Sequence, residues 1–379
     1  MKTVLVIGAQ GVLGALTAEI FRAAGWNVLR GGRRVETAAD FRLVDLDREE
    51  TFAAACCGVD LVVSAVEDPD CRAERHVLEN GGAILTMASS RAADRDRLAA
   101  SVSHPKGTVI YGAGYSGLTA IAIKDLLMRH PAADTVLAAY TMSITGMSGR
   151  GGALFGHRVL AGGSKRATRT VDFGAPLGRL ICLEVDLSDD RWSDPAILGA
   201  RAAAFYVTLA EKGVFRMLRW LDRLGLLARL PARWMRPQPP KSSRIEHATA
   251  EPMMTWLAVS RGGQLMGSAT LSTHGDYLTT ARIAEKMAGL VLAADARPGT
   301  FTVDTWFDWK DVAAAAEAIG VEVRQLFAGS CIGQVERAPT DSALGLTPLS
   351  ATGAVGRLDL ANAPCTPIHP LVPANEETQ

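Results

Sequence analysis

Three glycines near the N-terminus stand three residues apart between two apolar segments. The segment Gly8-Ala9-Gln10-Gly11-Val12-Leu13-Gly14 separates the apolar run 4–7 from an apolar helical pattern over 12–24. In such a turn one glycine bends the strand, the next lets backbone N–H groups approach a pyrophosphate, and the third lets helix and strand pack closely. The start of the helix adds about half a positive charge. These residues predict a dinucleotide site at Gly8, Gln10, Gly11, Val12, Leu13 and Gly14.

The residues after the second apolar run indicate which dinucleotide this site prefers. NAD sites usually carry an acid about 20 residues after the turn, where it binds the adenosine ribose. The segment 27–34 contains no acid here and three arginines, Arg30, Arg33 and Arg34. A guanidinium suits the 2′-phosphate of NADP because it forms charge-assisted hydrogen bonds. We therefore expect Arg33 and Arg34 to select NADP, with a solvated basic loop as the alternative.

Residues at the ends of two further runs are placed near the cofactor by topology. Asp45 follows the expected strand 41–44, and we expect it to reach the adenine. Ser64, Ala65 and Val66 follow the expected strand 59–64 and should line the central path of the cofactor.

The elements that must position these residues alternate regularly up to about Tyr111. Short apolar runs separated by helix-like segments are typical of a parallel sheet covered on both faces. The expected strands are Val4–Ile7, Asn27–Leu29, Phe41–Val44, Val59–Ser64, Ala83–Met87 and Thr108–Tyr111. This pattern predicts an α/β fold with a Rossmann domain over 1–117.

Beyond Gly117 the alternation weakens, which predicts a second α+β domain with a mixed sheet over 118–328 and an irregular tail over 329–379. The last helices of this second domain would pack back on the Rossmann domain. Glycines between 253–260 and 265–272 predict a β-hairpin, because glycine supplies the positive φ of the turn. Other expected strands are 136–144 and 180–187, and expected helices are 118–129, 277–292 and 309–319.

Composition and missing motifs exclude several classes of protein. The formal net charge is +0, so no overall field attracts nucleic acid. Six cysteines without paired spacing indicate reduced thiols in a cytoplasmic protein, and no metal-binding motif occurs. None of the five tyrosines precedes a lysine by four residues, which excludes a standard short-chain dehydrogenase. Gly146 to Arg150 lacks the last glycine of a hydrolase nucleophile elbow.

Two further glycine-containing segments, Gly112-Ala113-Gly114 and Gly275-Asp276-Tyr277-Leu278-Thr279-Thr280-Ala281, complete a family pattern with the first turn. With them the chain resembles the saccharopine dehydrogenase-like family of NADP-dependent reductases over about 1–324. The resemblance implies a Rossmann domain, an α+β domain behind it, and hydride transfer between the two. The family commonly has Asp-Pro-Gly where this chain has Ser116-Gly117 after Tyr115, so amino-acid substrate chemistry is not carried over.

Candidate catalytic residues lie next to these two segments. Tyr115 is the first candidate to donate a proton or position the substrate, with packing of the domain junction as the alternative. His274 and Tyr277 form a second polar cluster, in which we expect Asp276 to cap the following helix. The predicted reaction is the NADP-dependent reduction of a C=N or activated C=C bond in a small or lipid-like substrate. The competing hypothesis is a non-catalytic NADP-binding scaffold that docks on membranes or partner proteins through the segment 213–241.

A basic amphipathic segment spans residues 213–241. Apolar and arginine positions recur at helical spacing, with Phe215, Leu218, Leu221 and Trp234 on the apolar face. A buried helix, a lid over a hydrophobic substrate, a homodimer contact and a peripheral membrane contact all fit this pattern.

Overall fold

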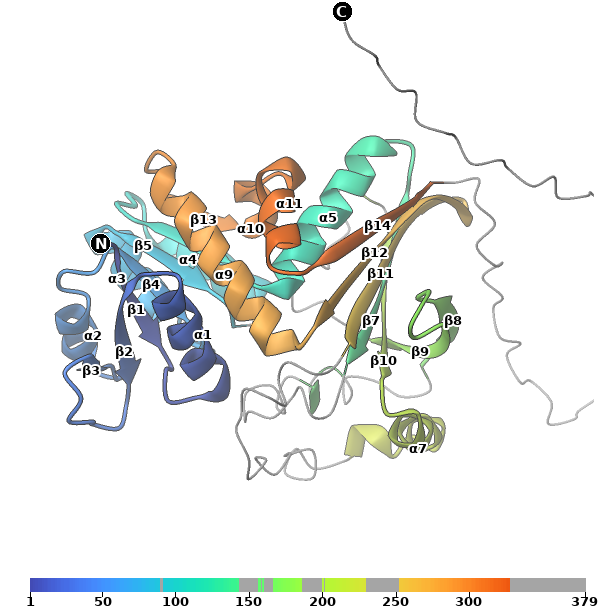
Figure 1. Ribbon diagram of the computed structural model, residues 1–379, viewed down its shortest axis with the longest axis horizontal. Helices are drawn as coiled ribbons and strands as arrows, with labels where there is room; N and C mark the ends of the chain where they lie inside the picture. Colours follow the sequence, from blue (N-terminus) through green and yellow to red (C-terminus); the bar gives the residue numbers. More distant parts are fainter. Residues whose placement is uncertain are drawn as a thin grey trace, which may run out of the picture. The chain divides into compact units, whose positions relative to one another are not determined.

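A computed structural model describes residues 1–88, 91–142, 156–157, 159, 166–185, 200, 202–229 and 252–327 of the chain. These residues form two β-sheets with helices packed on them (Figure 1). The expected tail 329–379 lies outside the described residues, as do 143–144 and 186–187 of two expected strands and 230–241 of the basic segment.

The first sheet is parallel throughout, as the alternating pattern predicts. Its strands in spatial order are β13 (Gly299–Thr302), β6 (Thr108–Tyr111), β5 (Ala83–Thr86), β4 (Leu61–Ser64), β1 (Thr3–Ile7), β2 (Asn27–Gly32) and β3 (Phe41–Leu43). Six of them are the predicted strands in the order of a Rossmann sheet. The edge strand β13 was not predicted, because its four residues come from late in the chain and are too short to show a period.

Helices cover both faces of this sheet. They are α1 (Val12–Ala23), α2 (Glu49–Ala55), α3 (Arg72–Asn80) and α4 (Ala92–Ser101). Side chains alternate across a strand, so Val4 and Val6 belong to the core that contains Phe21 of α1. Leu5 and Ile7 belong to a separate core on the opposite face, formed with α2, α3 and α4.

The second sheet is mixed, as predicted. Its order is β14 (Glu322–Phe327), β12 (Gln264–His274), β11 (Pro252–Arg261), β7 (Thr135–Met142), β10 (Ala202–Leu209), β9 (Arg179–Val185) and β8 (Thr168–Asp172). Strands β7 and β10 pair in parallel and the other pairs are antiparallel. The predicted hairpin is β11–β12, and its turn residues Gly262 and Gly263 have φ values of +55° and +85°.

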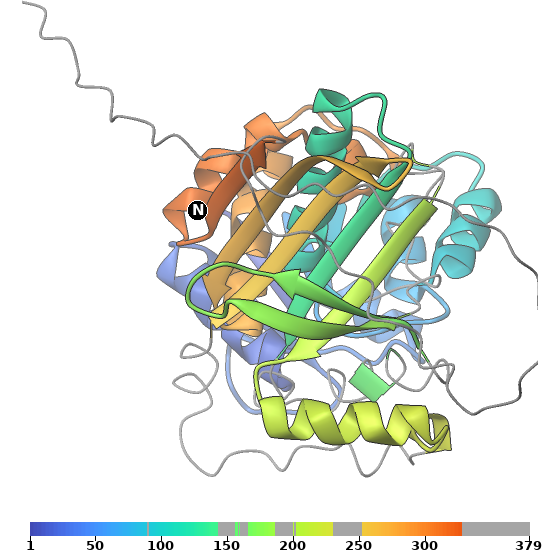
Figure 2. The same cartoon turned by 90° about the vertical axis from the view of Figure 1, so that its right-hand side faces the viewer.

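Helices lie behind the second sheet in the view of Figure 2. They are α5 (Tyr115–Arg129), α9 (Asp276–Ala293), α10 (Val303–Trp306) and α11 (Trp309–Ala318). A further helix, α7 (Lys212–Arg223), lies at the end of β10 together with the short helix Leu227–Arg229. Helix α9 also packs against α1, where Trp26 Nε1 donates to Glu285 Oε1 at 3.2 Å. One apolar core therefore runs from β1 through α9 to the second sheet.

Two negative findings apply to the described part of the chain. It contains no helix that combines the length and apolar composition needed to cross a bilayer. It also contains no group of three or more His, Cys, Asp or Glu side chains arranged to hold a metal ion.

Candidate functional site

The predicted glycine turn connects β1 to α1 in a conformation that requires its glycines. Gly8 has a φ of +80°, which favours glycine. Its carbonyl accepts a hydrogen bond from Gly11 N at 2.8 Å. A Cβ on Gly14 would lie 2.2 Å from the same carbonyl oxygen, and a Cβ on Gly8 would lie 2.6 Å from Val66 Cγ1. The turn and the helix therefore approach each other as closely as backbone atoms allow.

The first turn of α1 presents backbone donors without side-chain caps. Gly11 is the N-cap residue, and no side chain bonds the helix start. The first intrahelical bond runs from Ala15 N to Gly11 O at 2.9 Å, so the N–H groups of Val12, Leu13 and Gly14 have no partner within the helix. These three donors and the helix dipole fit a phosphate group, and a side chain at Gly14 would push the helix away from the turn backbone at Gly8 and Ala9.

The side chain of Gln10 links the turn to the segment after β2. Its Nε2 donates to Arg34 O at 2.7 Å, and its Oε1 accepts from Arg34 N at 3.2 Å. A Cβ on Gly32 would lie 2.6 Å from Gln10 Oε1, so a side chain at this position would displace the Gln10 side chain. The predicted cofactor ligand Gln10 thus holds the backbone of a predicted phosphate-binding arginine.

The three arginines of this segment differ in their contacts. Arg30 forms ion pairs with Asp40 at 3.1 Å and Glu36 at 3.0 Å, and these bonds raise the pKa of its guanidinium. Arg33 and Arg34 are exposed, and neither forms an ion pair within the described residues. Two guanidinium groups at the end of β2 are therefore accessible to an anion.

Glu36 is an acid that lies just beyond the segment 27–34, so the NADP expectation did not take it into account. Its Oε1 accepts from Gln10 Nε2 at 2.9 Å, and its Oε2 pairs with Arg30 NH1 at 3.0 Å. Both carboxylate oxygens are thus bonded to the protein, and the neighbouring Arg30 balances the charge.

The other predicted cofactor residues also lie at the carboxyl ends of parallel strands. Asp45 follows β3, and its Oδ1 accepts from Asp47 N at 3.3 Å. Ser64 ends β4, and its Oγ lies 3.5 Å from Val66 N. Ala65 N donates to Ile7 O at 3.1 Å, which keeps the segment Ser64 to Val66 beside the glycine turn. The fold therefore brings these residues to the same edge of the sheet as the turn.

Tyr115 begins α5 and is buried at the junction of the two sheets. Only 4% of its surface is exposed, and its hydroxyl donates to Leu271 O of β12 at 3.4 Å. Its backbone N donates to Thr280 Oγ1 of α9 at 3.4 Å. Burial raises the pKa of the phenol well above its ordinary value. Tyr115 is therefore neutral near neutral pH and connects α5, α9 and β12, whereas its catalytic role stays a prediction.

The start of α9 contains the second predicted cluster. Gly275, with a φ of +72°, is the N-cap residue, so the expectation that Asp276 caps this helix is wrong. Asp276 is partly buried, and desolvation raises the pKa of its carboxyl to about 6 against a hydrogen bond from Thr280. Tyr277 packs near Leu16 of α1, while His274 is exposed. The structure thus joins Asp276 and Tyr115 through Thr280.

A further buried polar cluster lies at the ends of β5 and β6, on the opposite face of the first sheet. Glu74 of α3 is 3% exposed, and its Oε1 accepts from Thr86 Oγ1 at 3.3 Å. Its Oε2 is buried without a hydrogen-bond partner. Burial raises the pKa of this carboxyl to about 7, and Asp68 adds to the shift. The sequence carried no signal for this cluster, because only the fold buries Glu74.

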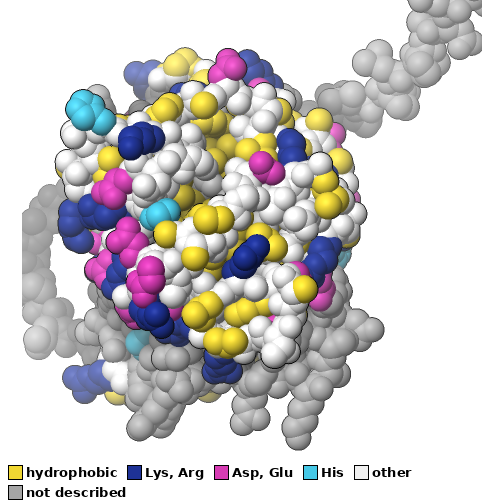
Figure 3. Space-filling view, turned by 90° about the vertical axis from the view of Figure 1, so that its left-hand side faces the viewer, with side chains coloured by type: hydrophobic (Ala, Val, Ile, Leu, Met, Phe, Trp, Pro, Cys, Tyr) yellow, Lys and Arg dark blue, Asp and Glu magenta, His cyan; other side chains and the backbone are white. Residues whose placement is uncertain are grey.

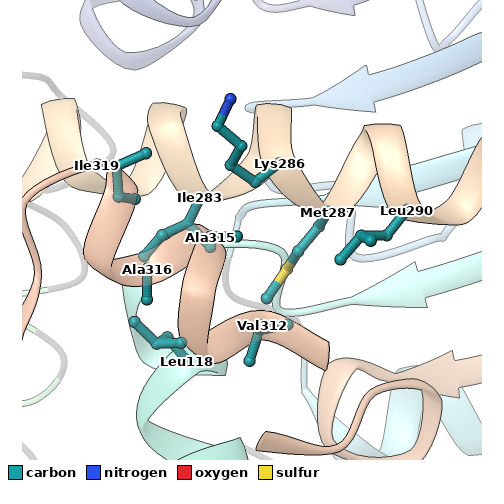
Figure 4. Close-up of a pocket in the computed structure, with 9 residues that line it drawn as sticks. All are labelled: Leu118, Ile283, Lys286, Met287, Leu290, Val312, Ala315, Ala316 and Ile319. Carbon is teal, nitrogen blue, oxygen red and sulfur yellow. The ribbon is translucent and has the colours of Figure 1, made fainter. Parts of the chain in front are cut away.

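A small apolar pocket occurs elsewhere, between α9, α11 and α5 (Figure 4). It is lined by Leu118, Ile283, Lys286, Met287, Leu290, Val312, Ala315, Ala316 and Ile319. None of the predicted site residues belongs to it. Its lining is apolar apart from Lys286, whose Nζ pairs with Glu285 Oε2 at 2.9 Å.

Comparisons with known proteins were made by sequence and by structure. No protein-family model and no curated protein matches the sequence. The structure is similar to saccharopine dehydrogenase (L-Glu forming) from Saccharomyces cerevisiae, with a TM-score of 0.53 and 10% identity over 86% of this chain and 100% of that chain. It also matches an amine dehydrogenase from Mycobacterium smegmatis, with a TM-score of 0.44 and 13% identity over 80% and 95% of the two chains. A third match is GenD2 from gentamicin A biosynthesis, solved with NAD, with a TM-score of 0.38 and 14% identity over 86% and 97%.

The first of these similarities covers 86% of this chain, so it is not confined to one of the two sheets. It agrees with the resemblance predicted from the three glycine-containing segments. The chain therefore has the α/β fold of saccharopine dehydrogenase.

Proposed function

We propose that the protein is an oxidoreductase that binds a nicotinamide dinucleotide at the turn Gly8–Gly14. The observation that carries the proposal is the start of α1, where three backbone donors have no partner within the helix and where a Cβ on Gly14 would lie 2.2 Å from Gly8 O. Such a helix start fits a pyrophosphate. The likeness of the fold to saccharopine dehydrogenase supports the same reading.

NADP is the form of the cofactor that we propose. Arg33 and Arg34 are exposed beyond β2 and form no ion pair within the described residues, so they are available to the 2′-phosphate. Glu36 is the acid nearest to them in the sequence, and both of its oxygens are bonded to Gln10 and Arg30. A carboxylate whose two oxygens are already bonded to the protein is a weak acceptor for hydrogen bonds from the ribose hydroxyls of NAD.

The reaction that we propose is the reduction of a C=N or activated C=C bond. The nicotinamide supplies the hydride when the cofactor is bound. The protein must orient the acceptor and hold a proton, and Asp276 suits the second task because its pKa of about 6 lies near neutrality. Tyr115 and Thr280 would position Asp276 through the contacts between α5 and α9.

The cofactor assignment is tested by calorimetric titration of NADPH and NADH into the purified protein. We expect the double variant Arg33→Ala/Arg34→Ala to lose roughly a hundredfold or more in affinity for NADPH and to change little toward NADH, since each of the two lost charge-assisted hydrogen bonds contributes about 1.5–3 kcal/mol. The control Arg261→Ala removes an exposed arginine from the β11–β12 hairpin. Equal losses for the two nucleotides would contradict the NADP assignment.

Turnover is tested separately by following NADPH absorbance with cyclic imines and with α,β-unsaturated thioesters. Oxidation of NADPH with either class supports the reductase. Tight binding of NADPH without oxidation by any of them would favour the non-catalytic scaffold instead.

A further inference from the structure

Helix α7 has one buried face and one exposed apolar face. Phe215 and Leu218 are 6% and 7% exposed and belong to the main core. On the other face Met217, Trp220 and Leu224 are 54%, 60% and 51% exposed. These positions follow the spacing i, i+3 and i+7, so they share one side of the helix. The exposed strip is therefore a continuous apolar surface on an element that the core holds in place.

Cations flank this strip. Lys212, Arg216, Arg219 and Arg223 recur at intervals of three and four residues, which places them along a neighbouring line of the helix. None of the four forms an ion pair with an acid in the part of the chain that the structure describes. The acid in the helix itself, Asp222, is 2% exposed and accepts from the backbone N of Arg166 at 3.0 Å.

Two observations indicate that Arg219, within this cationic line, has no anionic partner among the described residues. Arg219 Nε is buried without a hydrogen bond. The pKa of Arg219 is lowered by desolvation and by the neighbouring Arg223. By contrast, basic and acidic side chains are interspersed on the face of the molecule shown in Figure 3, and the formal net charge of the chain is +0. The positive field at α7 is therefore local.

We propose that this α7 surface, defined by Met217, Trp220, Leu224, Arg216 and Arg223, docks on an anionic lipid bilayer. An apolar strip beside a cationic line is the pattern of helices that lie in the plane of a membrane interface. Tryptophan is enriched at that interface, and arginines there meet anionic headgroups. A second copy of the chain is a poorer occupant, because a two-fold contact through this surface would bring arginines toward arginines.

Sedimentation with vesicles tests the proposal on the full chain without cofactor. Vesicles of equal parts phosphatidylcholine and phosphatidylglycerol should bind the protein, and vesicles of phosphatidylcholine alone should bind it at least roughly tenfold more weakly. The variant Trp220→Ser/Leu224→Ser should lose roughly tenfold or more in binding, since it removes the inserted apolar groups. The variant Arg216→Gln/Arg223→Gln should lose the preference for anionic lipid and the sensitivity to salt.

Met128→Ser is the matched control, because Met128 of α5 is 55% exposed and lies on another helix. It should bind vesicles as the wild type does. All substituted side chains are exposed, and circular dichroism melting checks that each variant is folded.

Three results would overturn the proposal. The first is that the wild type does not bind anionic vesicles. The second is that the α7 variants bind them as well as the wild type does. The third is that vesicle binding is absent and sedimentation equilibrium shows a dimer that dissociates in the variant Trp220→Ser/Leu224→Ser. In the last case the surface is a contact between two copies. Each of these results leaves the NADPH titration unaffected, so this inference and the proposed function fail independently.

Discussion

Replacing the buried Glu74 with glutamine should change how the stability of the protein depends on pH. Glu74 is 3% exposed, and burial raises its pKa from the ordinary value of 4.5 to about 7. Between these two values the folded protein keeps the proton while the unfolded chain releases it. Unfolding therefore releases a proton, and the free energy of unfolding falls as the pH rises through this window.

The size of the effect follows from the shift in pKa. A rise from 4.5 to about 7 corresponds to roughly 3 kcal/mol lost between pH 4.5 and pH 7.5, at 1.36 kcal/mol for each unit. Glu74→Gln cannot ionise, so it should lack this loss. Glutamine keeps an acceptor for Thr86 Oγ1, and any cost of its unpaired amide is the same at both pH values. The change in relative stability between the two pH values therefore reports only the ionisation of Glu74.

Urea unfolding followed by fluorescence measures this difference. Relative to the wild type, Glu74→Gln should gain roughly 3 kcal/mol in stability on going from pH 4.5 to pH 8. Glu79→Gln is the control, because Glu79 is exposed on the same helix. A relative stability of Glu74→Gln that stays constant over this range would refute the argument that burial sets the ionisation of Glu74.

Other predictions concern the turn and the start of α9. Gly14→Ala should abolish binding of the dinucleotide and lower the free energy of unfolding by about 1–3 kcal/mol, because its Cβ meets Gly8 O. Gly289→Ala, in the open interior of α9, should instead raise the free energy of unfolding by about 0.5–1 kcal/mol in the same urea assay. Tyr115→Phe should cost about 1 kcal/mol through the lost bond to Leu271 O, and an unchanged unfolding midpoint would argue against that bond. If Asp276 holds the reacting proton, kcat/KM for reduction should fall as the pH rises through about 6, and Asp276→Asn should have low activity without this inflection.

Alternation of side chains made the first sheet predictable from the sequence. Val4 and Val6 pack on one face and Leu5 and Ile7 on the other, so the short apolar run indicates a strand buried on both sides. Glycine spacing was equally informative at Gly8 and at Gly262, because a positive φ is a property of a single residue.

The site was less predictable where contacts join distant parts of the chain. Asp276 was expected to cap α9, but Gly275 occupies the cap position and Asp276 bonds Thr280 instead. The bonds of Gln10 with Arg34 and Glu36 depend on the relative placement of two strands. No local pattern encodes such pairings, since each requires the fold to be known first.

The position of β13 at the edge of the first sheet has a consequence for biosynthesis. This strand comes from residues 299–302 but pairs with β6, whose four residues are all buried. While the ribosome is still translating the second sheet, one edge of β6 has unpaired backbone groups beside apolar side chains. Such an edge promotes association with other nascent chains. Chains truncated before Gly299 should therefore aggregate, even though they contain every other strand of the first sheet.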